Sequence, residues 1–165
     1  RGTKTVIRDT RKTTPGLRNL EKYAVRMGGG VNHRSTLAEA ALVKDNHIAA
    51  AGSVSNAIRA IKENAPTVEL EVEVDTLEQL KEALAAGAKF IMLDNMDIDM
   101  TVEAVEITAG RAKLESSGGL TLESARIYAQ SGVDFLAVGA LTHSAKALDI
   151  SLDFKIDPKE SRKVN

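Results

Sequence analysis

Short apolar segments alternate with amphipathic segments along almost the whole chain, and this alternation limits the folds open to it. Six segments have the length and composition of strands: residues 4–9, 41–46, 68–74, 90–94, 112–117 and 135–139. Apolar residues at helical spacing predict helices over residues 17–27, 54–63, 77–86, 100–108 and 122–131, and a short one from Ser144. Strict alternation of this kind predicts a parallel sheet with right-handed helical crossovers.

Capping residues mark the ends of several predicted helices. Ser53 and Thr121 stand where an N-cap belongs, and Thr76 begins a capping box. Gly87 and Gly132 follow the ends of their helices, as a left-handed C-cap requires.

The spacing of the later strands, roughly 20 residues, is typical of a barrel wall. An open doubly wound sheet is the alternative, but it usually carries a glycine-rich nucleotide turn after its first strand, and residues 10–16 lack one. The strands are fewer than the eight of a complete barrel. We therefore predict an incomplete TIM-like (β/α) barrel of six to seven parallel strands. Residues 1–157 form a single domain in this interpretation, and residues 158–165 form a charged C-terminal tail.

The composition excludes several classes of protein. Lys and Arg number 22 against 23 for Asp and Glu, so the chain lacks the basic excess of a nucleic-acid-binding protein. With no cysteine, a disulfide scaffold and a thiolate metal site are excluded, and a reducing compartment fits. No apolar run approaches the roughly 20 residues of a membrane span, and the first residues do not form a signal peptide. We expect a soluble, cytoplasmic protein without nucleic-acid or membrane partners.

Polar residues end nearly every predicted strand. In barrel enzymes the reactive groups lie at the carboxyl ends of strands and in the loops that follow them. The six strand ends contribute Asp9, Arg11 and Lys12; Lys44, Asp45, Asn46 and His47; Glu73 and Asp75; Asp94 and Asn95; Glu115, Ser116, Ser117, Gly118 and Gly119; and Gly139, Thr142 and His143. Their convergence on one rim predicts a single site.

The third predicted strand alternates acidic and aliphatic residues at period two. One face would pack on the helices, and the other would point Glu71, Glu73 and Asp75 into the barrel. There these acids would meet Lys44 and a further cation such as Lys113, because unpaired buried acids are costly. The alternative is an edge strand with one face in water.

Several segments have the residues of anion sites. Residues 10–13 and 32–34 are basic, and guanidinium groups suit carboxylate or phosphate binding. Residues 116–119 close a strand just before a helix begins near Thr121, which brings backbone N–H groups and a helix N-terminus together. Residues 139–143 do the same after the sixth strand, and barrel phosphate sites commonly use the last two loops.

Seven motifs together resemble the quinolinate phosphoribosyltransferase family, also called decarboxylating nicotinate-nucleotide pyrophosphorylase. The resemblance covers about residues 3–154 and keeps the family's order. The motifs are residues 9–18, residues 28–30 with His33 and Arg34, residues 44–47, 71–74, 93–95, 115–119 and 138–143.

The resemblance implies a reaction and its requirements. Quinolinate and phosphoribosyl pyrophosphate would give nicotinate mononucleotide, pyrophosphate and CO2, with Mg²⁺ as cofactor, in NAD biosynthesis. It also implies a homo-oligomer. Family members carry an N-terminal domain ahead of the barrel, which packs on a neighbouring subunit and contributes an arginine to its quinolinate pocket. The printed sequence begins almost at the first predicted strand.

The resemblance also implies roles for individual residues. Quinolinate would be bound by Thr10, Arg11, Lys12, His33, Arg34 and Lys44. The phosphoribosyl and phosphate groups would be bound by Lys12, Glu73, Asp94, Ser117, Gly118, Gly119, Val138, Gly139, Ala140 and His143. Lys44, Glu73 and Asp94 would be catalytic, and Glu73 and Asp94 would also hold Mg²⁺.

Other functions fit parts of the sequence. The chain could be a non-catalytic barrel that keeps an anion site, or a related pyrophosphorylase for another heteroaromatic acid. An aldolase-like enzyme would use Lys44 or Lys12 as a Schiff-base nucleophile.

Arg8 replaces the apolar residue usual in the family, and we expect it to point toward the helices or an outer surface.

Overall fold

Six parallel strands form one sheet in the computed structural model, which describes residues 2–154. The strands are β1 (Val6–Arg8), β2 (Ala41–Val43), β3 (Leu70–Val74), β4 (Phe90–Asp94), β5 (Lys113–Ser117) and β6 (Phe135–Ala137). Their order across the sheet is β1-β6-β5-β4-β3-β2. The predicted domain boundary at residue 157 and the charged tail lie outside the described residues.

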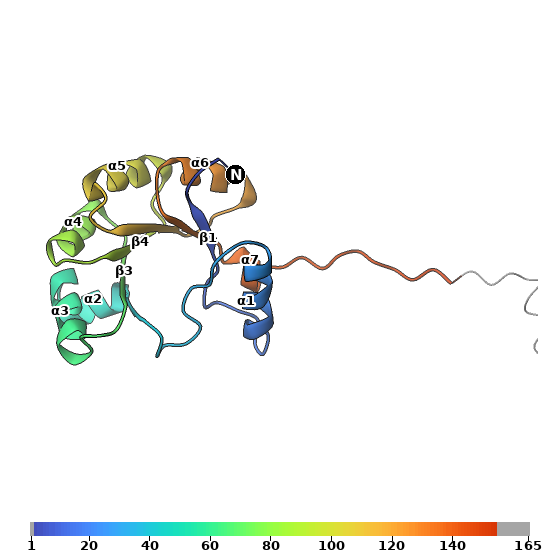
Figure 1. Cartoon of the computed structure of the whole chain (residues 1–165), viewed down its shortest axis with the longest axis horizontal. Helices are drawn as coiled ribbons and strands as arrows, with labels where there is room; N and C mark the ends of the chain where they lie inside the picture. The colour runs from blue at the N-terminus through green and yellow to red at the C-terminus, as the bar shows by residue number, and fades with distance from the viewer. Residues whose placement is uncertain (1, 155–165) are drawn as a thin grey trace, which may run out of the picture.

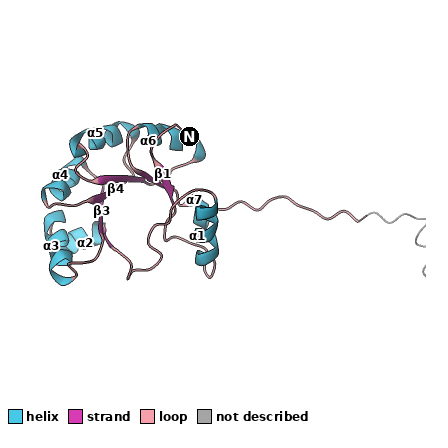
Figure 2. Cartoon of the chain, in the orientation of Figure 1, coloured by secondary structure: helices cyan, strands magenta, loops and turns pink. Residues whose placement is uncertain are grey.

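The sheet is curved, and helices cover its convex outer side (Figure 1). The helices are α1 (Arg18–Met27), α2 (Asp45–Ala51), α3 (Val54–Asn64), α4 (Leu77–Ala85), α5 (Ile98–Thr108), α6 (Leu122–Gln130) and α7 (Ala140–His143). In Figure 2 this layer of helices lies on one side of the strands, and in the part of the chain that the structure describes the other side of the sheet carries no helical layer. Among the described residues, no helix combines the length and the apolar character that crossing a membrane requires.

The strand order confirms the incomplete barrel. β1 pairs with β6, as the first and last strands do in a closed barrel, while β1 and β2 form the two edges of the sheet. Residues 28–40 connect α1 to β2, and Val31 forms a single parallel bridge with Arg8. A doubly wound sheet would reverse its strand order near the middle, and this sheet does not.

The apolar core lies between the sheet and the helices. Val72 and Val74 of β3 are fully buried and belong to the same core cluster as Ile58 of α3, Leu80 of α4 and Leu93 of β4. The other face of the sheet carries polar residues. β3 lies between β2 and β4, so the alternative of an edge strand is wrong.

The predicted caps at Ser53, Thr76 and Thr121 are confirmed. Their hydroxyl oxygens accept from the backbone N–H three residues later, at 3.1, 3.2 and 3.3 Å.

Two helix predictions differ from the structure. Among residues 2–154 the last helix is α7, which ends before Ser144, and Leu148 beyond it is 81% exposed. A short amphipathic segment with no surface to pack against is not stable as a helix, which explains the error.

The second difference is α2, which sequence analysis missed. It begins at Asp45, directly after Lys44, within residues 41–46 that we predicted as strand. His47 Nδ1 accepts from the Lys44 backbone N–H at 3.0 Å and closes the first turn. The abrupt change from strand to helix has a consequence for the site, because it fixes the backbone of Lys44.

Candidate functional site

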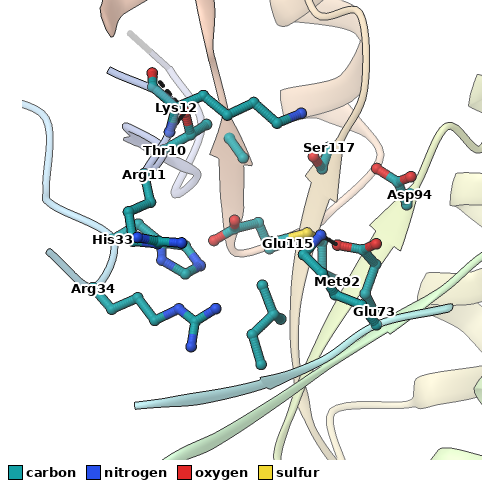
Figure 3. A pocket seen from close by; sticks show the side chains of 13 residues that line it. Thr10, Arg11, Lys12, His33, Arg34, Glu73, Met92, Asp94, Glu115 and Ser117 are labelled. Carbon is teal, nitrogen blue, oxygen red and sulfur yellow. Dashed lines mark hydrogen bonds and ion pairs between the residues drawn. The ribbon is translucent and has the colours of Figure 1, made fainter. Parts of the chain in front are cut away.

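One cavity of about 260 Å³ opens where the carboxyl ends of the strands meet, and we call it the first cavity (Figure 3). It is lined by Thr10, Arg11, Lys12, His33, Arg34, Leu42, Lys44, Glu73, Met92, Asp94, Glu115, Ser117 and Ala137. These residues come from β2 to β6 or the positions directly after them, from the loop after β1, and from the segment between α1 and β2. The structure therefore brings residues from all six predicted strand ends to one rim, although Asp45, Asn46, His47 and Asp75 line neither this cavity nor the one beside it.

A second cavity of about 370 Å³ adjoins the first and shares five of its lining residues. Its further lining residues are Asn95, Gly118, Gly119, Leu120, Gly139, Ala140 and His143. Gly118 has φ +100°, and a Cβ there would overlap the side chain and backbone of Asn95. A Cβ at Gly139 would overlap the His143 ring. At Gly118 the positive φ and the nearby Asn95 backbone require glycine, whereas at Gly139 a side chain would displace the His143 ring.

A buried ion pair holds the segment that carries His33 and Arg34. Asp9 is fully buried, and its Oδ1 accepts from Lys22 Nζ at 2.6 Å and from the His33 backbone N–H at 2.8 Å. Its Oδ2 accepts from Asn32 Nδ2 at 2.5 Å. Asp9 therefore lies beneath the rim and ties α1 and residues 32–33 to β1, which aims the next side chains into the first cavity.

Lys44 and Glu73 form an ion pair on the opposite wall. Lys44 Nζ donates to Glu73 Oε2 at 2.5 Å, and the Glu73 side chain is largely buried. Asp94 lies on the same side of the first cavity (Figure 3) and accepts from Asn95 Nδ2 at 2.8 Å. Asp75, predicted to point inward with Glu73, is exposed at the end of β3. Lys113 does not meet these acids, because its Nζ pairs with Asp134 at 2.7 Å.

Arg34 is a cation with an incomplete set of partners. Its Nη1 donates to the Ala40 carbonyl at 2.6 Å, while its buried Nε has no partner among the described residues. Burial lowers the pKa of Arg34 below its ordinary value, and the charge of Arg11 lowers it further, against the opposing effect of Glu71. An anion between Arg11 and Arg34 would relieve this repulsion.

Four buried or half-buried side chains, Arg8, His33, Glu71 and Glu115, form a floor cluster under the first cavity. Arg8 Nη1 donates to Glu115 Oε2 at 2.5 Å and lies 3.9 Å from Glu71 Oε1. The expected orientation of Arg8 toward the helices is thus wrong, because alternation along β1 turns it to the concave face. Its guanidinium lies 4.9 Å from the Phe90 ring centre and 5.1 Å from that of Phe135.

The floor cluster holds an acid whose protonation is strongly perturbed. Burial raises the pKa of Glu115 to about 8, with Glu71 and Asp9 adding to the effect and Arg8 opposing it. His33 Nε2 lies 2.9 Å from Glu71 Oε2. Ligand atoms of His33, Glu71 and Glu115 lie within 4.8 Å of one another, a spacing that could suit a metal ion. We assign no metal to them, because the Arg8 guanidinium already supplies a positive charge to both acids.

The predicted site residues are brought together with one exception. Every one lines the first or the second cavity except Val138, whose side chain packs against the apolar core. Sequence analysis missed Leu42 and Met92, and it named Glu115 only as a strand-end residue. The signal was available, because these residues stand two positions before Lys44, Asp94 and Ser117 and so share their inward face.

Known proteins are similar to this chain in sequence and in fold. Residues 1–153 match the sequence profile of a family described as "Quinolinate phosphoribosyl transferase, C-terminal domain". The chain belongs to this family. A nicotinate-nucleotide pyrophosphorylase (carboxylating) of Mycobacterium leprae (strain TN) is 61% identical over 156 residues, which cover 93% of this chain and 55% of the relative.

Two more quinolinate phosphoribosyltransferase relatives agree with this assignment. A probable nicotinate-nucleotide pyrophosphorylase (carboxylating) of Bacillus subtilis (strain 168) is 53% identical over 148 residues, covering 89% of this chain and 51% of the relative. The structure of the nicotinate-nucleotide pyrophosphorylase from Francisella tularensis matches with a TM-score of 0.85 and 46% identity, covering 90% of this chain and 53% of that one. The chain thus spans about half the length of the relatives it matches.

Proposed function

We propose that this barrel carries the site at which a phosphoribosyl group passes from phosphoribosyl pyrophosphate to quinolinate. The products would be nicotinate mononucleotide, pyrophosphate and CO2. One observation carries the proposal: a cavity with four cations, Arg11, Lys12, Arg34 and Lys44, runs into a second cavity whose backbone is left open by glycines. Such a pair of compartments suits one dicarboxylate and one phosphorylated ribose.

The first cavity has the chemistry of a dicarboxylate subsite. Arg11 and Arg34 present guanidinium groups, which bind carboxylates through two parallel hydrogen bonds. Thr10 and His33 add further polar groups to the lining, and Lys44 faces them across the cavity. We assign the two carboxylates of quinolinate to this set.

The second cavity has the chemistry of a 5′-phosphate subsite. Ser117, Gly118 and Gly119 precede the nine-residue helix α6, so backbone N–H groups and a helix N-terminus occur together there. Gly139, Ala140 and His143 complete the lining. Lys12 lines both cavities, and we assign it to the pyrophosphate between them.

Glu73 and Asp94 fit a hard cation. Lys44 engages one oxygen of Glu73, and Asn95 engages one oxygen of Asp94, so each carboxylate keeps a second oxygen free of these contacts. Carboxylate oxygens are the ligands that Mg²⁺ prefers. We propose that these two residues hold Mg²⁺ and the ribose hydroxyls; when bound, the ion would neutralise charge on the pyrophosphate leaving group.

The chain's own residues would act by positioning and electrostatics. As pyrophosphate leaves, positive charge develops on the ribose, and Glu73 and Asp94 lie on the wall where they can stabilise it. The cations of the first cavity hold the pyridine nitrogen toward that centre. Once the nitrogen is bonded to ribose, the C–C bond to CO2 can break; the electron pair stays on the ring carbon beside the positively charged nitrogen until a proton from water replaces it, and Lys44 would stabilise that charge. We assign no dedicated general base.

The assembly and location of the protein form part of the same proposal. We propose that the protein forms a homo-oligomer. We also propose that it resides in the cytoplasm, a reducing compartment that fits a sequence with no cysteine. Leu17, Leu20, Tyr23 and Met27 form an exposed apolar stripe along α1, which could pack against another part of the assembly.

A Schiff-base role for Lys44 is disfavoured, because its Nζ is engaged by Glu73 and a nucleophile must be a free amine.

A ligand-detected NMR experiment tests the proposal. The chain would be mixed with quinolinate, phosphoribosyl pyrophosphate and Mg²⁺, so that saturation transfer reports binding and nicotinate mononucleotide signals report turnover. We expect both substrates to bind. Product would show that the barrel suffices for catalysis. A folded chain that binds neither substrate would overturn the proposal in favour of a non-catalytic barrel.

A further inference from the structure

Glu115 is an acid on the floor of a cavity in which cations outnumber carboxyl groups. It lies at the middle position of β5, is fully buried, and extends across the floor of the first cavity toward His33 (Figure 3). Its Oε2 accepts from Arg8, but its Oε1 has no partner among the described residues. A carboxylate in this place would repel the anion that the surrounding cations attract.

The groups facing Glu115 do not balance a negative charge on it. Arg8 from β1 brings one positive charge, while Glu71 from β3 and the nearby Asp9 bring negative charge; His33 completes the surroundings. Asp9 is already paired with Lys22. Arg8 is therefore shared between two carboxyl groups, while His33 Nε2 lies 2.9 Å from Glu71 Oε2, so Glu71 has a second basic neighbour and Glu115 relies on Arg8.

We propose that Glu115 is a binding residue that acts as the neutral acid, forming an uncharged floor to the dicarboxylate subsite and donating a hydrogen bond from its carboxyl O–H to a carboxylate oxygen of the bound anion. The proton belongs on Oε1, because Arg8 donates to Oε2. This inference rests on the proposed function, since the anion is the dicarboxylate assigned to the first cavity.

The charge of the lining supports this assignment. Four cations and three carboxyl groups line the first cavity. With Glu115 neutral, Glu73 and Asp94 are the carboxylates that remain, and the lining carries a net charge of +2, which matches a dicarboxylate. Ionisation of Glu115 would lower that charge and place a carboxylate against the ligand. The raised pKa of Glu115, about 8, agrees with a neutral group at physiological pH.

Calorimetric titration of quinolinate into the chain at about pH 7 and about pH 9 tests the binding role. The dicarboxylate stays fully ionised over this range, so a change in affinity reports on the protein. For the wild-type chain we expect an affinity about tenfold weaker at the higher pH, as the neutral fraction of Glu115 falls. Glu115→Gln keeps the shape and the donor but cannot ionise, and its affinity should be the same at both pH values.

Glu103→Gln is the matched control, because it makes the same chemical change at an exposed position on α5. It should show the wild-type decrease in affinity between the two pH values. The proposal is overturned if Glu115→Gln loses affinity to the same extent as the control, or if the wild-type chain shows no dependence on pH.

A second measurement decides the protonation state without any ligand. In a chain labelled with ¹³C at the glutamate carboxyl groups, the signal that disappears in Glu115→Gln belongs to Glu115. We expect its chemical shift to titrate with a midpoint near pH 8. A midpoint in the ordinary acidic range would overturn the proposal. A midpoint near 8 with no quinolinate binding at any pH would retain the neutral floor and reject the proposed substrate.

Discussion

Individual cations at and beneath the first cavity differ in how completely the fold satisfies them. Lys22 is buried and engaged by both Asp9 and the His33 carbonyl, so it is structural. Arg34 donates to one backbone carbonyl, and its buried Nε has no partner among the described residues, so the Nε–H remains available to a ligand. A group that the fold removes from water and leaves short of partners is a candidate for binding a ligand.

Arg34→Ala should weaken quinolinate binding and leave the fold intact. The loss of a charge-assisted contact is expected to cost about 1–3 kcal/mol of binding free energy. Calorimetric titration would measure the affinity, and thermal unfolding would check the fold. Arg59→Ala on the exposed face of α3 serves as the control. Equal affinities for the two variants would remove Arg34 from the site.

Gly118→Ala should impair binding of phosphoribosyl pyrophosphate. The residue has φ +100°, and the added Cβ would overlap Asn95, so the Gly118 backbone or Asn95 must shift, and both line the second cavity. We expect at least a tenfold loss of affinity, about 1.4 kcal/mol. Gly110→Ala is the control: Gly110 also has a positive φ, at +73°, but a Cβ there would meet open space. Titration of phosphoribosyl pyrophosphate into each variant would compare their affinities. Similar affinities would contradict the phosphate assignment.

The sequence predicts the inward residues of this site well where strand alternation carries the signal. Lys44, Glu73, Asp94 and Ser117, predicted from the strand ends, all line the first cavity. Val138 is the one predicted site residue that lines neither cavity, because its side chain packs on the core. The interior position of Arg8 was predicted wrongly, because alternation along β1 shows only which residues share a face; which face points inward is decided by contacts with distant residues, Arg8 with Glu115 and Asp9 with Lys22.

At the scale of elements, the Asp9–Lys22 ion pair joins α1 to β1 and holds residues 32–33 against both. Asp9→Ala would leave the Lys22 ammonium buried without a counter-charge. We expect a loss of about 3–5 kcal/mol in the free energy of unfolding, because breaking a buried pair strands one charge. Urea denaturation followed by circular dichroism would measure it.

The double variant Asp9→Asn with Lys22→Met separates the ion pair from the remaining contacts of Asp9. It should be more stable than Asp9→Ala, since neither charge is left buried alone. Quinolinate affinity should remain reduced, because an asparagine side chain at this position would not reproduce the full set of bonds that hold residues 32–33. A double variant no more stable than Asp9→Ala would show that the charge pair is not what stabilises this junction.

Element boundaries were predicted least well where backbone geometry changes within one residue. The sequence after β2 reads as a continued strand, yet Lys44 is already the N-cap of α2. Apolar spacing cannot locate such a change, because the decisive contact is local: His47 Nδ1 accepts from the Lys44 N–H. The longer helices α3 to α6 were predicted within a few residues, because their apolar faces repeat over two turns or more.

At the scale of the molecule, the barrel keeps a polar interior that is open between β1 and β2. The floor cluster lies within that interior, and its protonation contributes to the stability of the whole fold. The ordinary pKa of a glutamic acid is 4.5, and burial raises that of Glu115 to about 8. Between these values the unfolded chain releases a proton that the folded chain retains.

The free energy of unfolding should therefore contain a contribution that decreases as pH rises from about 4.5 to about 8 and then levels off. Glu115→Gln removes this contribution, since glutamine does not ionise in either state. The difference in unfolding free energy between Glu115→Gln and wild type should grow in favour of the variant by a few kcal/mol between about pH 5 and about pH 8. Urea denaturation at a series of pH values measures both chains, and parallel curves would mean that Glu115 ionises normally in the folded protein.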